Sequence, residues 1–199
     1  MLHPILQRVK EIGGKVFTQG DWNLNLVGIR NPSGTPNKFD DEIHAIYKDG
    51  GQWVDRWWPV TTDPGTYWLE HPMNKLGTAA VVADRQYPGL WKIGKHQGKY
   101  EALVQVGEVA VHRDDNEDAK VDYREDNIQT GLFGINGPRA HATMPSINVD
   151  RWSAGCQVWA DPHDFDCALL LCKTQERERG WSTFTYTLLN GGWYRRRTR

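Results

Sequence analysis

The sequence predicts a single, mostly β domain with a short helix at its N-terminus and a longer helix towards its C-terminus. The chain has 199 residues, a length that suits one domain with a sizeable hydrophobic core. It contains 10 Trp and 20 Gly, and its runs of Thr and Val favour strands and turns over a helix bundle. The sequence shows no internal repeat, low-complexity linker or break in composition, so we expect residues 1–199 to form one unit.

Residues 1–14 are predicted to form the first helix. Apolar side chains recur there at helical spacing, and Gly13-Gly14 ends the pattern. From Val16 to about Val111 the chain reads as strands separated by turns, and the Asp-Gly-Gly of "KDGGQW" predicts a hairpin. Within the strands, Trp53, Trp57 and Trp58 are either core or a sugar-stacking surface, and alternation favours core.

The C-terminal part carries signals for one helix and one closing strand. The segment "ADPHDFDCALLLCKTQERERG" has an N-cap candidate in Asp161, Pro162 at the first helical position and Gly180 as the stop. "WSTFTYTLL" then alternates as a strand does. The last residues, 195–199, form a basic tail that is either disordered or attracted to anionic envelope polymers.

The charge balance and the N-terminus restrict the cellular setting. A formal net charge of -1 gives no general reason to expect nucleic acid or an anionic membrane as partner. The N-terminus "MLHPILQRVKEIGG" is too polar for a signal peptide, and no stretch is apolar enough to span a membrane. We therefore expect synthesis in the cytoplasm.

The cysteines are Cys156, Cys167 and Cys172, an odd number that argues against a disulfide framework. The last two are expected on different faces of the second helix.

The segment "DRWSAGCQVW" (Asp150 to Trp159) suggests nucleophilic chemistry. Cysteine catalysis needs a thiolate, a nearby base and backbone donors for an oxyanion. Gly155 permits a tight turn before Cys156, and Ser153 adds a polar group close in sequence. The base candidates are His141 and, more remotely, His96. The alternative is that Cys156 is a buried packing residue, as free cysteines often are.

"WSAGCQV", preceded by "TGLFGINGPRAH", resembles the active-site segment of the L,D-transpeptidase (YkuD-like) family, and the resemblance extends roughly from Trp57 to Val158. It implies a YkuD-like β-sandwich or barrel acting on peptidoglycan stem peptides. Cys156 matches the nucleophile that attacks a peptide carbonyl, and Ser153 and Gly155 match the residues before it. The acyl group would then pass from the thioester to an amine or to water.

The chain departs from the family pattern at three places. The window from Ile135 to Pro138 holds no His, Val158 replaces a family Arg, and Ala154 replaces a frequent His. Either His141 serves as base or the base is lost, and Arg139 or Arg151 would have to bind a substrate carboxylate.

The resemblance and these departures leave two functions open. One is an active enzyme in a phage lysis or tail assembly, or an exported effector, that reaches the wall by lysis or injection. The other is a catalytically inactive virion or wall-binding protein. A thiol probe would label an activated Cys156 faster than Cys167 or Cys172.

The acidic segment "DDNEDAKVDYRE" has the spacing of a calcium loop of the EF-hand type. Counted from Asp114, the residues at positions 3, 5, 7, 9 and 12 are Asn116, Asp118, Lys120, Asp122 and Glu125. The faults are Ala119 at position 6, where Gly normally turns the chain, and flanks that are strand-like rather than helical. The segment predicts a structural calcium ion, and the alternative is a solvated acidic hairpin. The remaining histidines show no zinc-ligand spacing.

Overall fold

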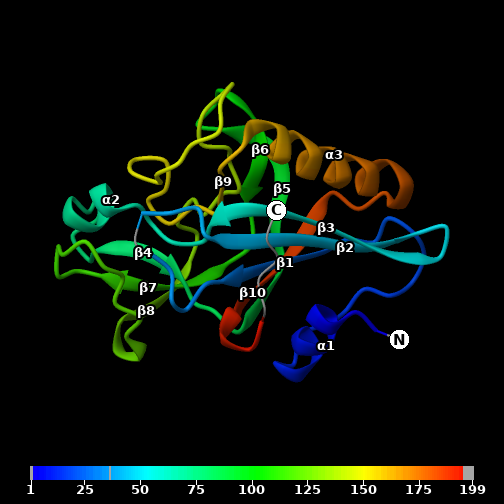
Figure 1. Ribbon diagram of the computed structural model, residues 1–199, viewed down its shortest axis with the longest axis horizontal. Helices are drawn as coiled ribbons and strands as arrows, with labels where there is room; N and C mark the ends of the chain where they lie inside the picture. The colour runs from blue at the N-terminus through cyan, green and yellow to red at the C-terminus, as the bar shows by residue number, and fades with distance from the viewer. Residues whose placement is uncertain (1, 36, 195–199) are drawn as a thin grey trace.

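The computed structural model describes residues 2–35 and 37–194, and it is mostly β, with 37% strand and 19% helix (Figure 1). The predicted fold class is therefore confirmed at this level. The predicted basic tail, residues 195–199, lies outside the described residues. Among the described residues, no helix is both long and apolar enough to cross a membrane.

Within the described residues, ten strands form two sheets. The larger sheet has the order β6-β5-β10-β1-β2-β3-β9, and the smaller has the order β4-β7-β8. All pairings are antiparallel except β1 with β10. The bounds are β1 Asn25–Arg30, β2 Asp41–Asp49, β3 Gln52–Thr61, β4 Thr78–Val81, β5 Arg85–His96, β6 Tyr100–Gln105, β7 Val109–Asp114, β8 Ile128–Gly131, β9 Val158–Trp159 and β10 Thr183–Asn190.

The larger sheet curls into a half-barrel, and one chain segment joins its two edge strands. Gly137 bridges to Leu103 of β6, and Arg139 bridges to Trp159 of β9. The Gly137 amide donates to the Leu103 carbonyl at 2.8 Å, and the Trp159 amide donates to the Pro138 carbonyl at 3.0 Å. We call residues 136–140 the seam segment. Cys156 lies beside the seam segment, because β9, to which the segment bonds, begins two residues after the cysteine.

Two helices cover opposite faces of the larger sheet (Figure 1). Helix α1 (Pro4–Glu11) buries Ile5, Leu6 and Val9 against residues of β1, β2 and β10. Helix α3 (Pro162–Arg179) contributes Phe165 and Leu169 to the main core on the other face. A third, short helix is α2 (Thr66–Glu70), and two 3-10 turns are η1 (Glu125–Asn127) and η2 (Gly191–Trp193).

Both predicted helices are confirmed, because their end signals are local, although α1 covers only Pro4–Glu11 of the predicted residues 1–14. The Asp161 carboxylate accepts the His163 amide at 2.8 Å, and Gly180 ends α3 in the left-handed conformation at φ 69°. Cys167 is exposed and Cys172 is buried, as expected for different faces of α3.

The predicted hairpin is also confirmed. Asp49 of β2 pairs with Gln52 of β3, and Gly50 and Gly51 between them have φ 55° and 77°. The closing strand β10 is confirmed too, although it lies inside the sheet rather than at an edge. Helix α2 was not predicted.

The three tryptophans of β3 have different environments. Trp58 is buried in the main core, as expected, and Trp53 packs against the α1 cluster. Trp57 is half-buried, and its ring centroid lies 6.4 Å from that of His44.

A buried polar contact ties β10 to the segment after Cys156. The Tyr186 hydroxyl donates to the Gln157 side-chain oxygen at 2.8 Å, and both residues are 0 % exposed. The Gln157 amide nitrogen lies 3.3 Å from the carbonyl oxygens of Thr62 and Gly155. One side chain therefore links β10, the end of β3 and the turn that carries Cys156.

We predict that Tyr186→Phe destabilises the protein by about 1–3 kcal/mol, because it leaves the buried Gln157 oxygen without a donor. Urea unfolding followed by tryptophan fluorescence measures the change. The double variant Tyr186→Phe/Gln157→Leu should lose less stability than the two single variants added together.

The matched control is Tyr47→Phe. Tyr47 is also buried, and its hydroxyl makes no hydrogen bond within residues 2–35 and 37–194. Equal losses in Tyr47→Phe and Tyr186→Phe would show that the Gln157 contact contributes nothing.

Candidate functional site

The turn from Ser153 to Cys156 is held by its own serine. The Ser153 hydroxyl donates to the Cys156 carbonyl at 2.8 Å and accepts the Gly155 amide at 3.1 Å. Gly155 has φ 119°, and a Cβ at this position would overlap the carbonyl oxygen of Ala79. Ser153 is fully buried, so it and Gly155 position the cysteine and do not line an open surface.

The Cys156 thiol lies against the backbone that leads into the seam segment. Its sulfur is 3.4 Å from the carbonyl oxygen of Gly134, to which the thiol donates. Burial raises the pKa of this thiol to about 11, and the backbone amide of Asn136 offsets only part of that rise. The residue is half-buried, and at neutral pH its resting form is the protonated thiol.

Asn136 connects the thiol region to His96. The Asn136 side-chain oxygen accepts the Gln105 backbone amide at 2.8 Å, which fixes the orientation of the side chain. Its nitrogen therefore faces Nδ1 of His96, at 3.0 Å, and donates to it. The neutral imidazole then carries its proton on Nε2. Burial, with a smaller contribution from Lys99, lowers the pKa of His96, so the ring is neutral at neutral pH.

A tyrosine and an arginine complete the surroundings of the thiol. The Tyr100 ring packs edge-on to His96, with centroids 5.7 Å apart. Burial raises the pKa of Tyr100, and the charge of a Cys156 thiolate raises it further, so the phenol and the sulfur are within electrostatic reach. The Arg139 guanidinium lies 4.1 Å from the Tyr100 ring centroid, which places a cation beside this group.

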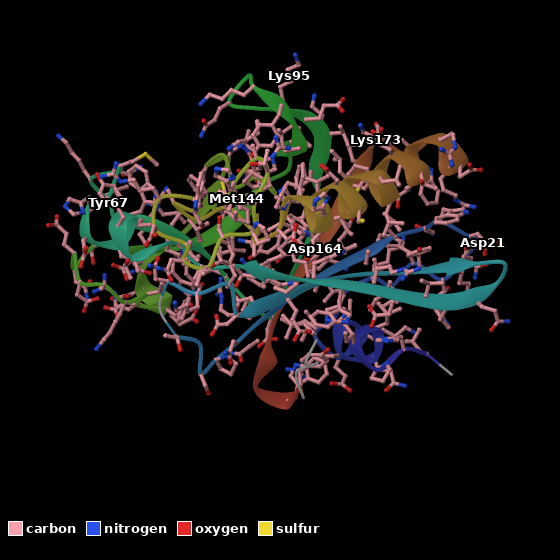
Figure 2. All side chains as sticks on the ribbon, turned by 45° about the horizontal axis from the view of Figure 1, so that its top comes forward. Asp21, Tyr67, Lys95, Met144, Asp164 and Lys173 are labelled. Atoms are coloured by element: carbon pink, nitrogen blue, oxygen red, sulfur yellow. The ribbon has the colours of Figure 1, made fainter. Side chains whose placement is uncertain are left out.

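His141, the first base candidate, is not brought to the cysteine. Its Nδ1 accepts the backbone amides of Thr143 and Met144, both at 3.2 Å, and its ring packs edge-on to Trp152. Its hydrogen bonds within the described chain therefore stay in its own turn, part of the loop that carries the labelled Met144 in Figure 2. The imidazole that the contacts link to Cys156 is His96, which follows Lys95 near the tip of the β5–β6 hairpin (Figure 2).

The two candidate arginines also differ in whether they lie near the Cys156 thiol. Arg139 belongs to the seam segment, whereas the Arg151 guanidinium lies over the Tyr67 ring at 3.9 Å. Tyr67 belongs to α2, far from Lys95 in the view of Figure 2. Of the two, only Arg139 contacts a neighbour of the thiol.

Sequence reasoning missed three residues of this site. They are Tyr100, the side chain of Asn136 and Gln157. Asn136 lies within residues 135–138, where the family pattern has a histidine. That position was the one sequence signal that pointed to Asn136.

The acidic loop between β7 and β8 is only partly assembled as a metal site. Across residues 2–35 and 37–194, no three His, Cys, Asp or Glu side chains converge as a ready-made metal site. Asp114 and Asp122 are in contact, because the Asp122 amide donates to an Asp114 oxygen at 2.7 Å. Glu125 instead begins η1 and lines a neighbouring cavity, so the structure does not bring it to the others.

That cavity, of about 450 Å³, is polar and was not predicted. Buried Arg30 pairs with Asp63 at 2.9 Å and donates to the Val81 carbonyl at 2.8 Å. Asp41 accepts the backbone amide and the hydroxyl of Thr62 at 2.7 Å, and burial together with the charge of Asp63 raises the pKa of Asp41 to about 7. These contacts join the ends of β1, β2 and β3.

No protein-family model, curated protein or solved structure matches the chain.

We predict slow alkylation of Cys156 by iodoacetamide at pH 7.5, because the thiolate is the reactive form and the pKa of this thiol is raised to about 11. Its rate should rise about tenfold per pH unit between pH 8 and 10. This replaces the expectation of fast labelling. Site-resolved peptide mass spectrometry measures it, with exposed Cys167 as the reference and buried Cys172 as the unreactive control. Faster labelling of Cys156 than of Cys167 at pH 7.5 would contradict the environment described.

Proposed function

We propose that this chain is a YkuD-like cysteine enzyme that acts on peptidoglycan stem peptides through a Cys156 thioester. The observation that carries the proposal is the arrangement around the sulfur. A half-exposed thiol stands on a glycine turn, beside a backbone amide, and one residue separates it from a neutral imidazole. The resemblance of "WSAGCQV" and its upstream segment supplies the substrate class.

In the proposed reaction, a protonated thiol loses its proton as it attacks. The Cys156 sulfur forms a bond to the peptide carbonyl carbon, while His96 accepts the thiol proton at Nδ1 and gives up its hydrogen bond from Asn136. The carbon–nitrogen bond then breaks, and His96 returns the proton to the leaving amine. An amine or water releases the acyl group from the thioester.

Backbone amides and Arg139 supply the other interactions. The Gly155 amide is taken up by the Ser153 hydroxyl, which fixes the turn, so we assign the Cys156 amide as the donor of fixed direction for the carbonyl oxygen. Arg139 is half-buried beside Tyr100, and we assign it to the carboxylate of the stem peptide. We place the proposed enzyme in the lysis or tail machinery of a phage.

A second candidate function is a wall-binding protein of this fold without turnover. Two observations favour it: the pKa of the Cys156 thiol is raised, and the hydrogen bonds of His141 lie in its own turn. Such a protein would bind the stem peptide near Arg139 and leave it intact.

We predict that the wild-type chain releases or crosslinks stem peptides from purified peptidoglycan and that Cys156→Ala abolishes this. His96→Gln should lower kcat about 10²-fold, because it removes the proton acceptor, whereas His141→Gln should leave kcat close to wild type. Mass spectrometry of muropeptides measures the products, and Cys167→Ala is the matched control for loss of a cysteine that is exposed on α3.

The outcomes separate the two functions. Loss of activity in His141→Gln with full activity in His96→Gln would overturn the assignment of the base. No new muropeptides with wild type, together with equal sedimentation of wild type and Cys156→Ala with peptidoglycan, would establish the binding protein instead.

A further inference from the structure

The loop between β7 and β8 holds a buried carboxylate that is only half satisfied. Asp114 ends β7 and is 1 % exposed. One of its oxygens accepts the Asp122 amide at 2.7 Å, while the other, Oδ1, is buried and has no hydrogen-bond partner within the described residues. A buried carboxylate oxygen without a donor or cation is costly, so this oxygen needs a positive partner.

The neighbours of Asp114 are carboxylates rather than cations. Burial raises the pKa of Asp114, and the charges of Asp122, Asp118 and Asp115 raise it further. Asp115 is paired with Arg124 at 2.7 Å, whereas Asp118 and Asp122 share a single donor. The Asn116 amide nitrogen lies 2.9 Å from an Asp122 oxygen and 3.4 Å from an Asp118 oxygen. The neutral amide of Asn116 is therefore the donor that Asp118 and Asp122 share, and the charges of both carboxylates act on Asp114.

The backbone of the loop does not depend on glycine at position 119. The left-handed turn is made by Glu117 at φ 56°, not by Ala119. The absence of Gly at position 119 therefore causes no strain, which removes the main objection raised by the sequence. Asn116 and Asp118 accept the amides two residues ahead at 3.2 and 2.8 Å, so the loop engages the single side-chain oxygen of Asn116 and one of the two oxygens of Asp118.

We propose that the loop binds one calcium ion through the carboxylates of Asp114, Asp118 and Asp122 and the side-chain oxygen of Asn116. Binding requires the Asn116 amide to turn, so that its oxygen gives up the Asp118 amide and replaces the nitrogen that now lies between the two carboxylates. It also requires Asp114, Asp118 and Asp122 to move together, since no three such side chains converge within the described residues. The Lys120 carbonyl and water complete an oxygen shell of the kind that calcium prefers. Glu125, which begins η1, is left out of the proposed ligand set. The site is independent of the chemistry at Cys156.

The test is a melting curve of the full chain with about 2 mM CaCl₂ or with EDTA, alongside calcium titration calorimetry. Calcium should raise the melting temperature of wild type by about 5 °C, because it binds the folded state alone. Asp118→Asn should lose both this shift and the heat of binding. The matched control is Glu117→Gln, which removes the same charge from an exposed side chain of the same loop and should keep both.

A further variant separates a ligand role from a purely structural one. Asp114→Asn should not lower the melting temperature in EDTA, since it removes a buried charge that lacks a partner, yet it should lose the calcium shift. Equal curves for wild type in calcium and EDTA, or a shift that Asp118→Asn retains, would overturn the proposal. Cys156→Ala should respond to calcium as wild type does, so the test of the calcium site does not depend on the proposed enzyme activity.

Discussion

The closing of the curled sheet by residues 136–140 is the constraint on which the rest of the site depends. A half-barrel leaves two edge strands with unpaired backbone groups, and here β6 and β9 both bond to this one segment. Because the Gln157 amide also donates to the Asn136 carbonyl at 2.9 Å, the cysteine turn is tied to the same seam. Any displacement of Asn136 would change the closure and the thiol's surroundings together.

Closure explains why the thiol is both held and shielded. The Gln157 side chain anchors the turn to Tyr186 and Thr62 from inside the sheet, and Ser153 fixes it locally. These contacts place Cys156 where protein replaces water on several sides, which is the reason that its pKa rises. The same exclusion of water keeps His96 neutral. The packing that holds Cys156 in place is therefore also what keeps the Cys156 thiol and the His96 imidazole neutral.

The parts that could be predicted are those whose causes are local. Asp161, Pro162 and Gly180 define α3 without reference to any other element, and two glycines define the β2–β3 turn. The position of β10 between β5 and β1 depends on pairings across the whole chain, which alternation alone does not contain. His141 was favoured because it is close to Cys156 in sequence. Its turn instead uses the ring as an acceptor, and His96 reaches the site because the β5–β6 hairpin lies against the seam segment.

A neutral thiol and a neutral imidazole that both contact Asn136 have a consequence for the proposed chemistry. In a preformed thiolate–imidazolium pair, the pKa of the thiol is lowered, so most of the cysteine is present as thiolate. Each thiolate is then a weaker nucleophile, because the nucleophilicity of a thiolate falls with the pKa of its thiol. In this chain the raised pKa of Cys156 reverses that balance. The thiolate is rare at rest and strongly nucleophilic when formed, so a base has to act during the attack. Asn136 holds the candidate base by the nitrogen that would take the proton, and exchange of that one hydrogen bond would switch His96 from a structural acceptor to a general base.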